Sequence, residues 1–212
     1  MDTDISLLDK KKWLRSFGRT KGQRFKEKNL IRLNDYLFNG CNANNCTYHL
    51  EIGFGYGEHL LHKAQLNPHI QYIGAEVYLN GVGNLLQNIT AHNIKNIYIW
   101  PDDVRILLEK FPELQISKTY ILFPDPWPKR RTNKRRLINS EFLSLLFKRM
   151  NQDFEIIVAS DIVDYIKWVE KILSNFNYPY TKQKPLCMNN IKTRYQSKST
   201  HTIHWLSITQ HS

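Results

Sequence analysis

The sequence predicts a doubly wound α/β fold with a mostly parallel seven-stranded sheet and a C-terminal antiparallel hairpin. From residue 47 onward, short apolar runs of strand length alternate with segments of helical periodicity. The first run ends in a cluster of glycines, as expected where a strand turns tightly into a helix. Alternating strands and helices build a parallel sheet with helices on both faces. Such sheets bind ligands beyond the carboxyl ends of their strands.

Five strands and five helices are expected before the C-terminal hairpin. Ser140 and Asp161 are the expected caps of the last two helices, and Gly81 and Gly83 weaken the second helix. The expected strands cover 47–53, 70–77, 96–100, 117–123 and 154–160, and the helices cover 57–66, 80–93, a short turn ending near 110, 141–151 and 162–175. Residues 177–190 are expected to form a loop, and runs 191–197 and 202–208 the closing antiparallel pair.

The chain is expected to comprise a basic N-terminal arm, 1–30, and one folded domain, 31–212. Between residues 10 and 28 nine Lys and Arg residues face a single acid, Glu27. Aromatic residues inside this segment indicate an arm that is ordered, or that becomes ordered on binding, rather than a disordered tail.

Charge and composition narrow the class of protein. The formal net charge is +11 at pH 7 and the isoelectric point is about 9.5. This excess points to a polyanion such as RNA, DNA or anionic lipid, with a basic protein lacking such a partner as the alternative. Neither a signal peptide nor an apolar run of membrane-span length is visible, so a cytoplasmic location and no membrane partner are expected. Cys41, Cys46 and Cys187 are expected to be free thiols, and no metal site is expected.

The glycine loop after the first strand carries the first functional signal. It reads Glu51-x-Gly53-x-Gly55-x-Gly57. A dinucleotide-binding loop has its third glycine one position later, where Glu58 stands here, and the two acids would repel a pyrophosphate. The spacing resembles motif I of the Rossmann-like methyltransferases, whose glycine loop packs against the methionine part of S-adenosylmethionine. A plain turn is the alternative interpretation.

Acidic residues also follow the second and third strands. Glu76 ends the second strand, where a carboxylate can accept hydrogen bonds from both hydroxyls of a ribose. Asp102 follows the third strand, where this class places an acid that accepts from the adenine amino group. Asp103 is the neighbouring alternative, and the register favours Asp102. The three acids predict one cofactor-binding edge.

The stretch after the fourth strand carries the catalytic signal. Asp125 lies between two prolines that stiffen its backbone. Six of the eight positions that follow, from 129 to 136, are basic. Beside a ligand site, such a run predicts capture of nucleic-acid phosphates. The six residues are Lys129, Arg130, Arg131, Lys134, Arg135 and Arg136.

These motifs together resemble the bacterial tRNA (guanine-N7-)-methyltransferases. The stretch FPDPWPKRRTNKRRL is similar to that family's signature, and RSFGRTKGQR at 15–24 to its N-terminal segment. EIGFGYGEHL and GAEVY match the cofactor motifs, and TRYQSKST at 193–200 the C-terminal motif. The resemblance covers about 13–208. It implies S-adenosylmethionine as cofactor and a guanine in the tRNA variable loop as target.

The resemblance also implies residue roles. Asp125 is expected both to contact the cofactor and to act in catalysis. The family's substrate motif T-x-x-E reads Thr193-Arg194-Tyr195-Gln196 here, so Gln196 can hydrogen-bond but carries no charge. The expected cofactor contacts are Glu51, Gly53, Gly55, Gly57, Glu76, Asp102 and Asp125, and the expected substrate contacts are Lys129, Arg135, Arg136, Asp161, Thr193 and Gln196.

Two alternatives stay open at this point. One is a methylase of another RNA position or of an amine, although the D/N-P-P-Y/F tetrapeptide of amine methylases is replaced by Asp125-Pro126-Trp127-Pro128. The other is a non-catalytic RNA-binding protein, against which the complete set of acids argues. The chain is expected to act as a monomer, with a homodimer as the alternative.

Overall fold

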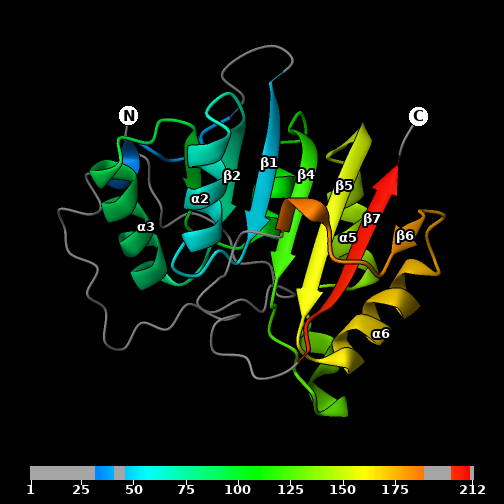
Figure 1. Ribbon diagram of the computed structural model, residues 1–212. Coiled ribbons are helices and arrows are strands. Elements are labelled where there is room, and N and C mark those ends of the chain that lie inside the picture. Colours follow the sequence, from blue (N-terminus) through cyan, green and yellow to red (C-terminus); the bar gives the residue numbers. More distant parts are fainter. Residues whose placement is uncertain (1–31, 41–45, 189–201, 211–212) are drawn as a thin grey trace.

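The computed structural model describes residues 32–40, 46–188 and 202–210, and in this part a single twisted sheet forms the centre (Figure 1). Its strand order is β3-β2-β1-β4-β5-β7-β6. All neighbouring pairs are parallel up to β5, and β7 runs antiparallel to both β5 and β6. The strands are β1 (Thr47–Ile52), β2 (Gln71–Ala75), β3 (Ile97–Trp100), β4 (Gln115–Leu122), β5 (Met150–Ser160), β6 (Tyr180–Thr181) and β7 (His204–Gln210).

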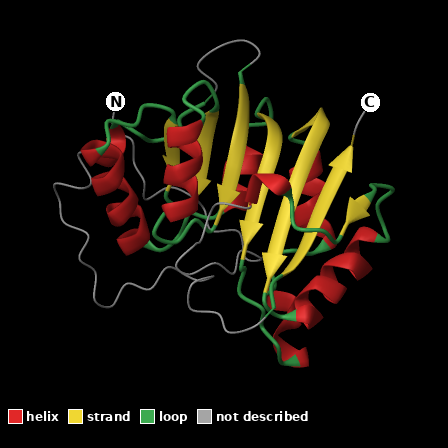
Figure 2. Ribbon diagram, viewed as in Figure 1, coloured by secondary structure: helices red, strands yellow, loops and turns green. Residues whose placement is uncertain are grey.

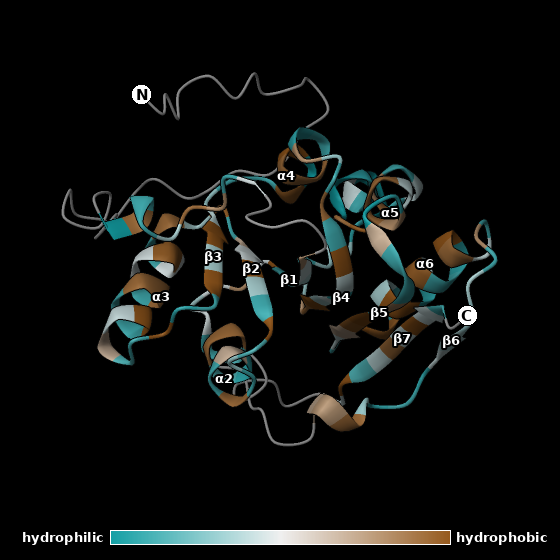
Figure 3. Cartoon of the chain, turned by 90° about the horizontal axis from the view of Figure 1, so that it is seen from above, coloured by the Kyte–Doolittle hydropathy of each residue, from teal (hydrophilic) through white to brown (hydrophobic). Residues whose placement is uncertain are grey.

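Helices cover both faces of the sheet (Figure 2). Seen from above, α2 lies on one side of the sheet, and α4, α5 and α6 lie on the other (Figure 3). The helices are α2 (Glu58–Leu66), α3 (Leu79–Ala91), α4 (Val104–Lys110), α5 (Ser140–Phe147) and α6 (Val163–Leu173), with 3-10 helices η2 (Arg130–Arg135) and η3 (Leu186–Met188). The predicted doubly wound, mostly parallel sheet is therefore confirmed.

Two large hydrophobic cores hold the helices on the sheet, and a smaller third one packs Met188 of η3 against β4, β5 and β7. The larger one packs α4, α5 and α6 against the sheet, and the second packs α2 and α3 against β2 and β3. In α3, Leu85, Leu86 and Ile89 are fully buried. Burying each such side chain contributes roughly 1.5–3 kcal/mol, which outweighs the cost of the two glycines in this helix. α3 accordingly spans the predicted segment.

The predicted caps of α5 and α6 were wrong. The N-cap of α5 is Asn139, whose Oδ1 accepts from the Phe142 N–H at 2.8 Å, and Ser140 is the first helical residue. Asparagine and serine cap helices equally well, so residue type alone does not decide between them. α6 begins at Val163 after Ile162, which makes no side-chain cap. Asp161 therefore lies before the helix rather than at its cap.

The C-terminal region differs in part from the prediction. β7 confirms the second predicted run, and its partners in the described chain are β5 and β6. β6 lies in 177–190, which was wrongly predicted as loop throughout, because its two residues extend the free edge of β7. The other run, 191–197, and the arm 1–30 lie outside the described residues. Among the described helices, none has the length and apolar character to cross a membrane.

Candidate active site

The carboxyl ends of β1, β2 and β3 meet at one edge of the sheet. The backbone ladder continues just beyond the strands, since Gly53 N–H donates to Ala75 O at 2.8 Å and Glu76 N–H donates to Trp100 O at 3.0 Å. These bonds hold the segments after the three strands side by side. The predicted acids Glu51, Glu76 and Asp102 are thereby placed along the same edge.

The glycine loop adopts the left-handed conformations that its sequence predicts. Gly53, Gly55 and Gly57 have φ values of 70°, 58° and 82°. A Cβ on Gly57 would lie 2.7 Å from the side chain of Leu85, so α3 packs directly on the loop. A Cβ on Gly53 or Gly55 would meet nothing within 4 Å. Open space beside an exposed loop backbone fits the close approach of a ligand.

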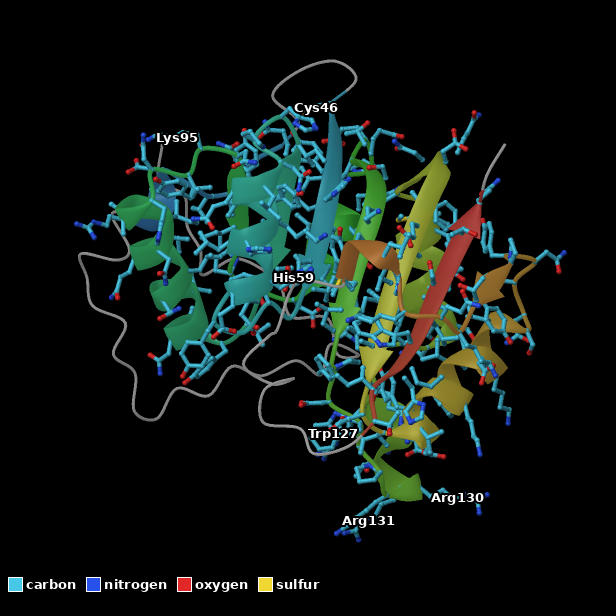
Figure 4. All side chains as sticks on the ribbon, in the orientation of Figure 1. Cys46, His59, Lys95, Trp127, Arg130 and Arg131 are labelled. Carbon is cyan, nitrogen blue, oxygen red and sulfur yellow. The ribbon has the colours of Figure 1, made fainter. Side chains whose placement is uncertain are left out.

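Glu51 is buried and held by a histidine that sequence reasoning missed. Its Oε2 lies 2.7 Å from His59 Nδ1, and the side chains are 5% and 1% exposed. Because an ionised carboxylate only accepts, the imidazole donates from Nδ1. The ring of His59, labelled in Figure 4, also packs edge-on against Tyr120 at 4.7 Å. The available signal was a histidine in the first turn of the helix after the glycine loop.

Glu76 links the glycine loop to the end of β2. Its Oε2 accepts from Gly55 N–H at 2.7 Å, and its Oε1 from Tyr78 N–H at 2.8 Å. Burial raises the pKa of this carboxyl, against the opposing effect of these backbone hydrogen bonds. A carboxylate has about four lone-pair sites, more than its backbone donors Gly55, Tyr78 and Val77 use, so Glu76 can also accept from a ligand.

Asp102 and Asp103 have different structural roles. Asp103 is buried, caps α4 by accepting from Arg105 N–H at 2.9 Å, and forms an ion pair with the Arg105 guanidinium. Asp102 is half-buried and its Oδ1 accepts from Asp103 N–H at 2.7 Å. Since Asp103 is committed to the start of α4, Asp102 is the acid that can meet a ligand at this edge.

The segment after β4 is backbone-strained around Asp125. Phe123 and Trp127 have φ values of 53° and 39°, a left-handed conformation that costs non-glycine residues roughly 1–2 kcal/mol each. Phe123 N–H donates to Ala159 O at 2.8 Å, which keeps the segment beside β5. Asp125 itself is exposed. Strain of this kind is typical of functional loops.

Most of the basic run forms the 3-10 helix η2. Lys129 and the four cations 130, 131, 134 and 135 are exposed, and Arg130 and Arg131 extend away from the sheet (Figure 4). The Arg135 guanidinium lies 5.0 Å from the centre of the Trp127 ring. The run therefore presents a cationic surface directly beside Asp125.

Arg136 departs from the prediction that it contacts substrate. It is only 2% exposed, and its guanidinium donates to Pro126 O and to Asp164 Oδ2 at 2.8 and 2.7 Å. A buried guanidinium with two protein acceptors is not available to a phosphate. Its assignment as a substrate contact is therefore corrected.

Comparison with known proteins identifies the family. A family model described as "Putative methyltransferase" matches residues 45–210. The tRNA (guanine-N(7)-)-methyltransferase of Neorickettsia sennetsu is 40% identical over 198 residues, covering 92% of this chain and 90% of that protein. The protein of the same name from Hyphomonas neptunium is 34% identical and covers 87% of this chain and 93% of its own. The chain belongs to the tRNA (guanine-N(7)-)-methyltransferase family.

Solved structures agree with the fold of this methyltransferase family. The crystal structure of the 16S rRNA methyltransferase KamB superposes with a TM-score of 0.56 at 12% identity, covering 94% of this chain and all of that one. At that identity the likeness concerns the fold alone. The family membership rests on the sequence relatives.

The acidic edge and the glycine loop fit the methyl donor of this class of enzymes. The open space beside Gly53 and Gly55 suits a ligand that lies against the loop backbone. Buried carboxylates suit its cationic amino and sulfonium groups. In the described part of the chain no group of three His, Cys, Asp or Glu side chains is arranged to hold a metal ion.

Of the remaining predicted substrate contacts of the methyltransferase, only Asp161 lies within the described residues. Asp161 follows β5 directly and is half-buried at the same sheet edge as Asp125. Thr193 and Gln196 lie outside the described residues. The structure thus brings Asp125, Lys129 and Asp161 to one end of the sheet.

Proposed function

We propose that this chain transfers the methyl group of S-adenosylmethionine to N7 of a guanine in tRNA. The observation that carries the proposal is the position of η2. Its exposed cations and Asp125 follow β4, beside the strands whose carboxyl ends carry Glu51, Glu76 and Asp102. A nucleic-acid surface therefore borders an acidic cofactor edge, in a chain whose relatives carry the name tRNA (guanine-N(7)-)-methyltransferase.

The cofactor roles follow from the position of each acid along the edge. Glu51, held by His59, would receive the amino group of the methionine part. Glu76 would accept from the ribose hydroxyls, and Asp102 from the adenine amino group. The backbone of the glycine loop would pack against the methionine part. When bound, S-adenosylmethionine supplies a methyl group that is already activated.

The chemical task of the protein is mainly positioning. Guanine N7 has a lone pair in the ring plane, so no base is needed to expose it. In-line alignment of the two reactants can contribute roughly 7–11 kcal/mol. The product ring is positively charged, and the Asp125 carboxylate would stabilise that charge as it develops. Asp161, Thr193 and Gln196 would hold the base, with Gln196 acting through neutral hydrogen bonds.

The substrate is proposed to be a guanosine in the tRNA variable loop. The N7 edge of guanine is not used in Watson–Crick pairing, so whether the enzyme can reach N7 depends on access to the groove. The basic arm (10–28) and the exposed cations of 129–135 would bind the phosphates on either side. We place this activity in the cytoplasm and propose that a monomer carries it out.

A labelling experiment tests the reaction and its position. The protein is incubated with unmodified tRNA and labelled S-adenosylmethionine, and the product is treated with borohydride and aniline, which cleave at N7-methylguanosine. We expect label in the tRNA and a single cleavage site in the variable loop. Label without cleavage would keep the methyl transfer and reject N7. Cleavage elsewhere would reject the variable loop.

A further inference from the structure

Arg136 differs from the other five cations of the basic run. It is 2% exposed, whereas the other five are exposed at the surface. Its guanidinium lies 5.5 Å from the ring centre of Tyr165 and 5.2 Å from that of Trp168, both on α6. The side chain is thus enclosed between the loop after β4 and the first turns of α6.

The guanidinium bridges two segments that carry predicted site residues. Nε donates to the carbonyl of Pro126, the residue after Asp125, at 2.8 Å. Nη2 donates to Asp164, three residues after Asp161, at 2.7 Å. These segments follow the neighbouring parallel strands β4 and β5. One side chain therefore connects the backbone next to Asp125 with the turn after Asp161.

The loop around Asp125 needs such an anchor because it has few hydrogen-bond donors of its own. Positions 124, 126 and 128 are prolines, which lack the backbone N–H. The loop is therefore held through its carbonyl groups. Asn133, with its amide oriented to satisfy its neighbours, donates to Trp127 O at 2.9 Å and Lys129 O at 3.1 Å. Arg136 holds the carbonyl of Pro126, the residue after Asp125, and its rigid planar fork fixes direction as well as distance.

We propose that Arg136 is a positioning residue for methyl transfer, which sets the placement of Asp125 relative to Asp161. This role rests on the proposed function, because it assigns those two aspartates to catalysis and base binding. Arg136 itself contacts neither tRNA nor cofactor. Its loss is expected to slow the reaction of bound substrate without weakening the binding of tRNA.

The test compares two Arg→Lys variants by single-turnover transfer of label to tRNA. Arg136→Lys keeps the charge but cannot bridge both acceptors, so we expect the rate to fall about tenfold or more, as small misplacements of reacting groups do. The tRNA Kd and its salt dependence are expected to stay within about twofold of wild type. Arg149→Lys is the matched control. Its guanidinium also holds a main-chain carbonyl, that of Leu108 at 2.8 Å, at the opposite end of β5.

A second variant decides the matter should Arg136→Lys not fold. Asp164 is 69% exposed, so Asp164→Asn leaves the core intact but weakens the hold on the guanidinium. We expect a rate reduced about two- to fivefold. Since an acid beside the basic run is removed, tRNA affinity should be equal or slightly higher. Slower transfer together with undiminished binding is a combination that a mere loss of stability would not produce.

The outcomes separate this role from the function on which it rests. Wild-type protein that transfers no label to tRNA overturns both. With active wild type, Arg136→Lys behaving like Arg149→Lys overturns the positioning role alone. So does a raised tRNA Kd with a shallower salt dependence and an unchanged rate for bound tRNA, which would make Arg136 a phosphate contact. Should only Asp164→Asn fold, a wild-type rate in that variant overturns the role.

Discussion

Among single residues, the buried acids of the cofactor edge are held in defined orientations by protein donors. Glu51 is buried and bonded to His59, and Glu76 is buried and bonded to backbone N–H groups that include those of Gly55 and Tyr78. A buried carboxylate without such partners would cost several kcal/mol. The His59 imidazole and the backbone N–H groups therefore fix the orientation of the two carboxylates.

His59 is expected to act on the cofactor through Glu51. His59→Ala leaves the buried carboxylate without its donor, an arrangement that costs about 1–3 kcal/mol. We expect S-adenosylmethionine affinity, measured by calorimetry, to fall about tenfold. His92→Gln, at an exposed position of the same protein, serves as control. An unchanged affinity in His59→Ala would show that Glu51 does not bind the cofactor in this orientation.

Asp125 is expected to affect the reaction and not the binding of tRNA. Asp125→Ala should abolish methylation, because the charge that develops on the guanine ring loses its stabilising carboxylate. Since Asp125 is exposed and its loop is held by other residues, the fold and the tRNA Kd should persist. Labelled-methyl transfer and filter binding measure the two quantities. Turnover near the wild-type rate would exclude the catalytic role.

His49 makes stability depend on pH. It is half-buried on β1 between Tyr72 and Tyr120, with ring centres 5.3 and 6.4 Å away. Burial, and secondly the charges of Lys118 and Lys63, lowers its pKa from 6.5 to about 4. A lowered histidine pKa means that the unfolded chain binds the proton first. Its contribution to stability is therefore complete above pH 6.5 and is lost as the pH falls toward 4.

Urea unfolding at pH 7 and pH 5 measures this contribution. Between these values we expect the free energy of unfolding to fall by about 2 kcal/mol on account of His49. His49→Gln should remove that part of the pH dependence, while His92→Gln should keep it. An identical pH dependence in wild type and His49→Gln would contradict the lowered pKa.

Among the elements, α3 and the glycine loop form one packed unit. A Cβ on Gly81 of α3 would overlap the carbonyl oxygen of Gly55. The glycine that weakens the helix in isolation is therefore what allows α3 to approach the loop.

Gly81→Ala tests this contact. Alanine would favour the helix by up to about 1 kcal/mol, but the overlap must displace the loop. We expect S-adenosylmethionine affinity to fall more than about tenfold, because the loop no longer offers its backbone in the same place. Gln87→Ala, at an exposed position of the same helix, should leave it unchanged. Equal affinities in the two variants would mean that the loop tolerates the shift.

η2 is expected to provide part of the salt dependence of tRNA binding. Lys134→Ala should raise the tRNA Kd and reduce the slope of log K against log salt by about 0.7–0.9 for one lost phosphate contact. Lys95→Ala removes an exposed cation at the opposite end of the sheet (Figure 4), and should have little effect. Titrations at several salt concentrations measure both. Equal slopes in the two variants would place the tRNA away from η2.

In the whole molecule, the strand order places two sets of proposed site residues on either side of the sheet centre. The acids proposed to bind the cofactor lie at the carboxyl ends of β1, β2 and β3 on one side, and Asp125 and Asp161 follow β4 and β5 on the other. The direction of strand succession reverses between β1 and β4, where doubly wound sheets bind their ligands. Donor and acceptor can therefore meet over the centre of the sheet while the basic surface stays at its border.

Most of the sheet and the position of Glu51, Glu76 and Asp102 at one edge of it were predictable from the sequence. Strand alternation and glycines are local signals, and parallel strands bring the residues after them to one edge. The cap of α5 was predicted wrongly because asparagine and serine cap equally well, and that of α6 because the helix begins after Ile162, which makes no side-chain cap. The strand β6 was missed because a two-residue strand has no periodicity of its own. Asp102 was distinguished from Asp103 by register, and the ion pair of Asp103 with Arg105 supports that choice.

The sequence by itself determined the fold class, the glycine loop, the order of the acids and the position of the basic run, because each depends on residues that are close together in the sequence. Only the tertiary structure decided which of these side chains are exposed and which hold other parts of the protein. His59 reaches Glu51 across eight residues and Arg136 reaches Asp164 across 28. Such contacts depend on how helices pack on the sheet, which spacing along the chain does not reveal. For that reason the basic run separated into five exposed cations and one buried anchor.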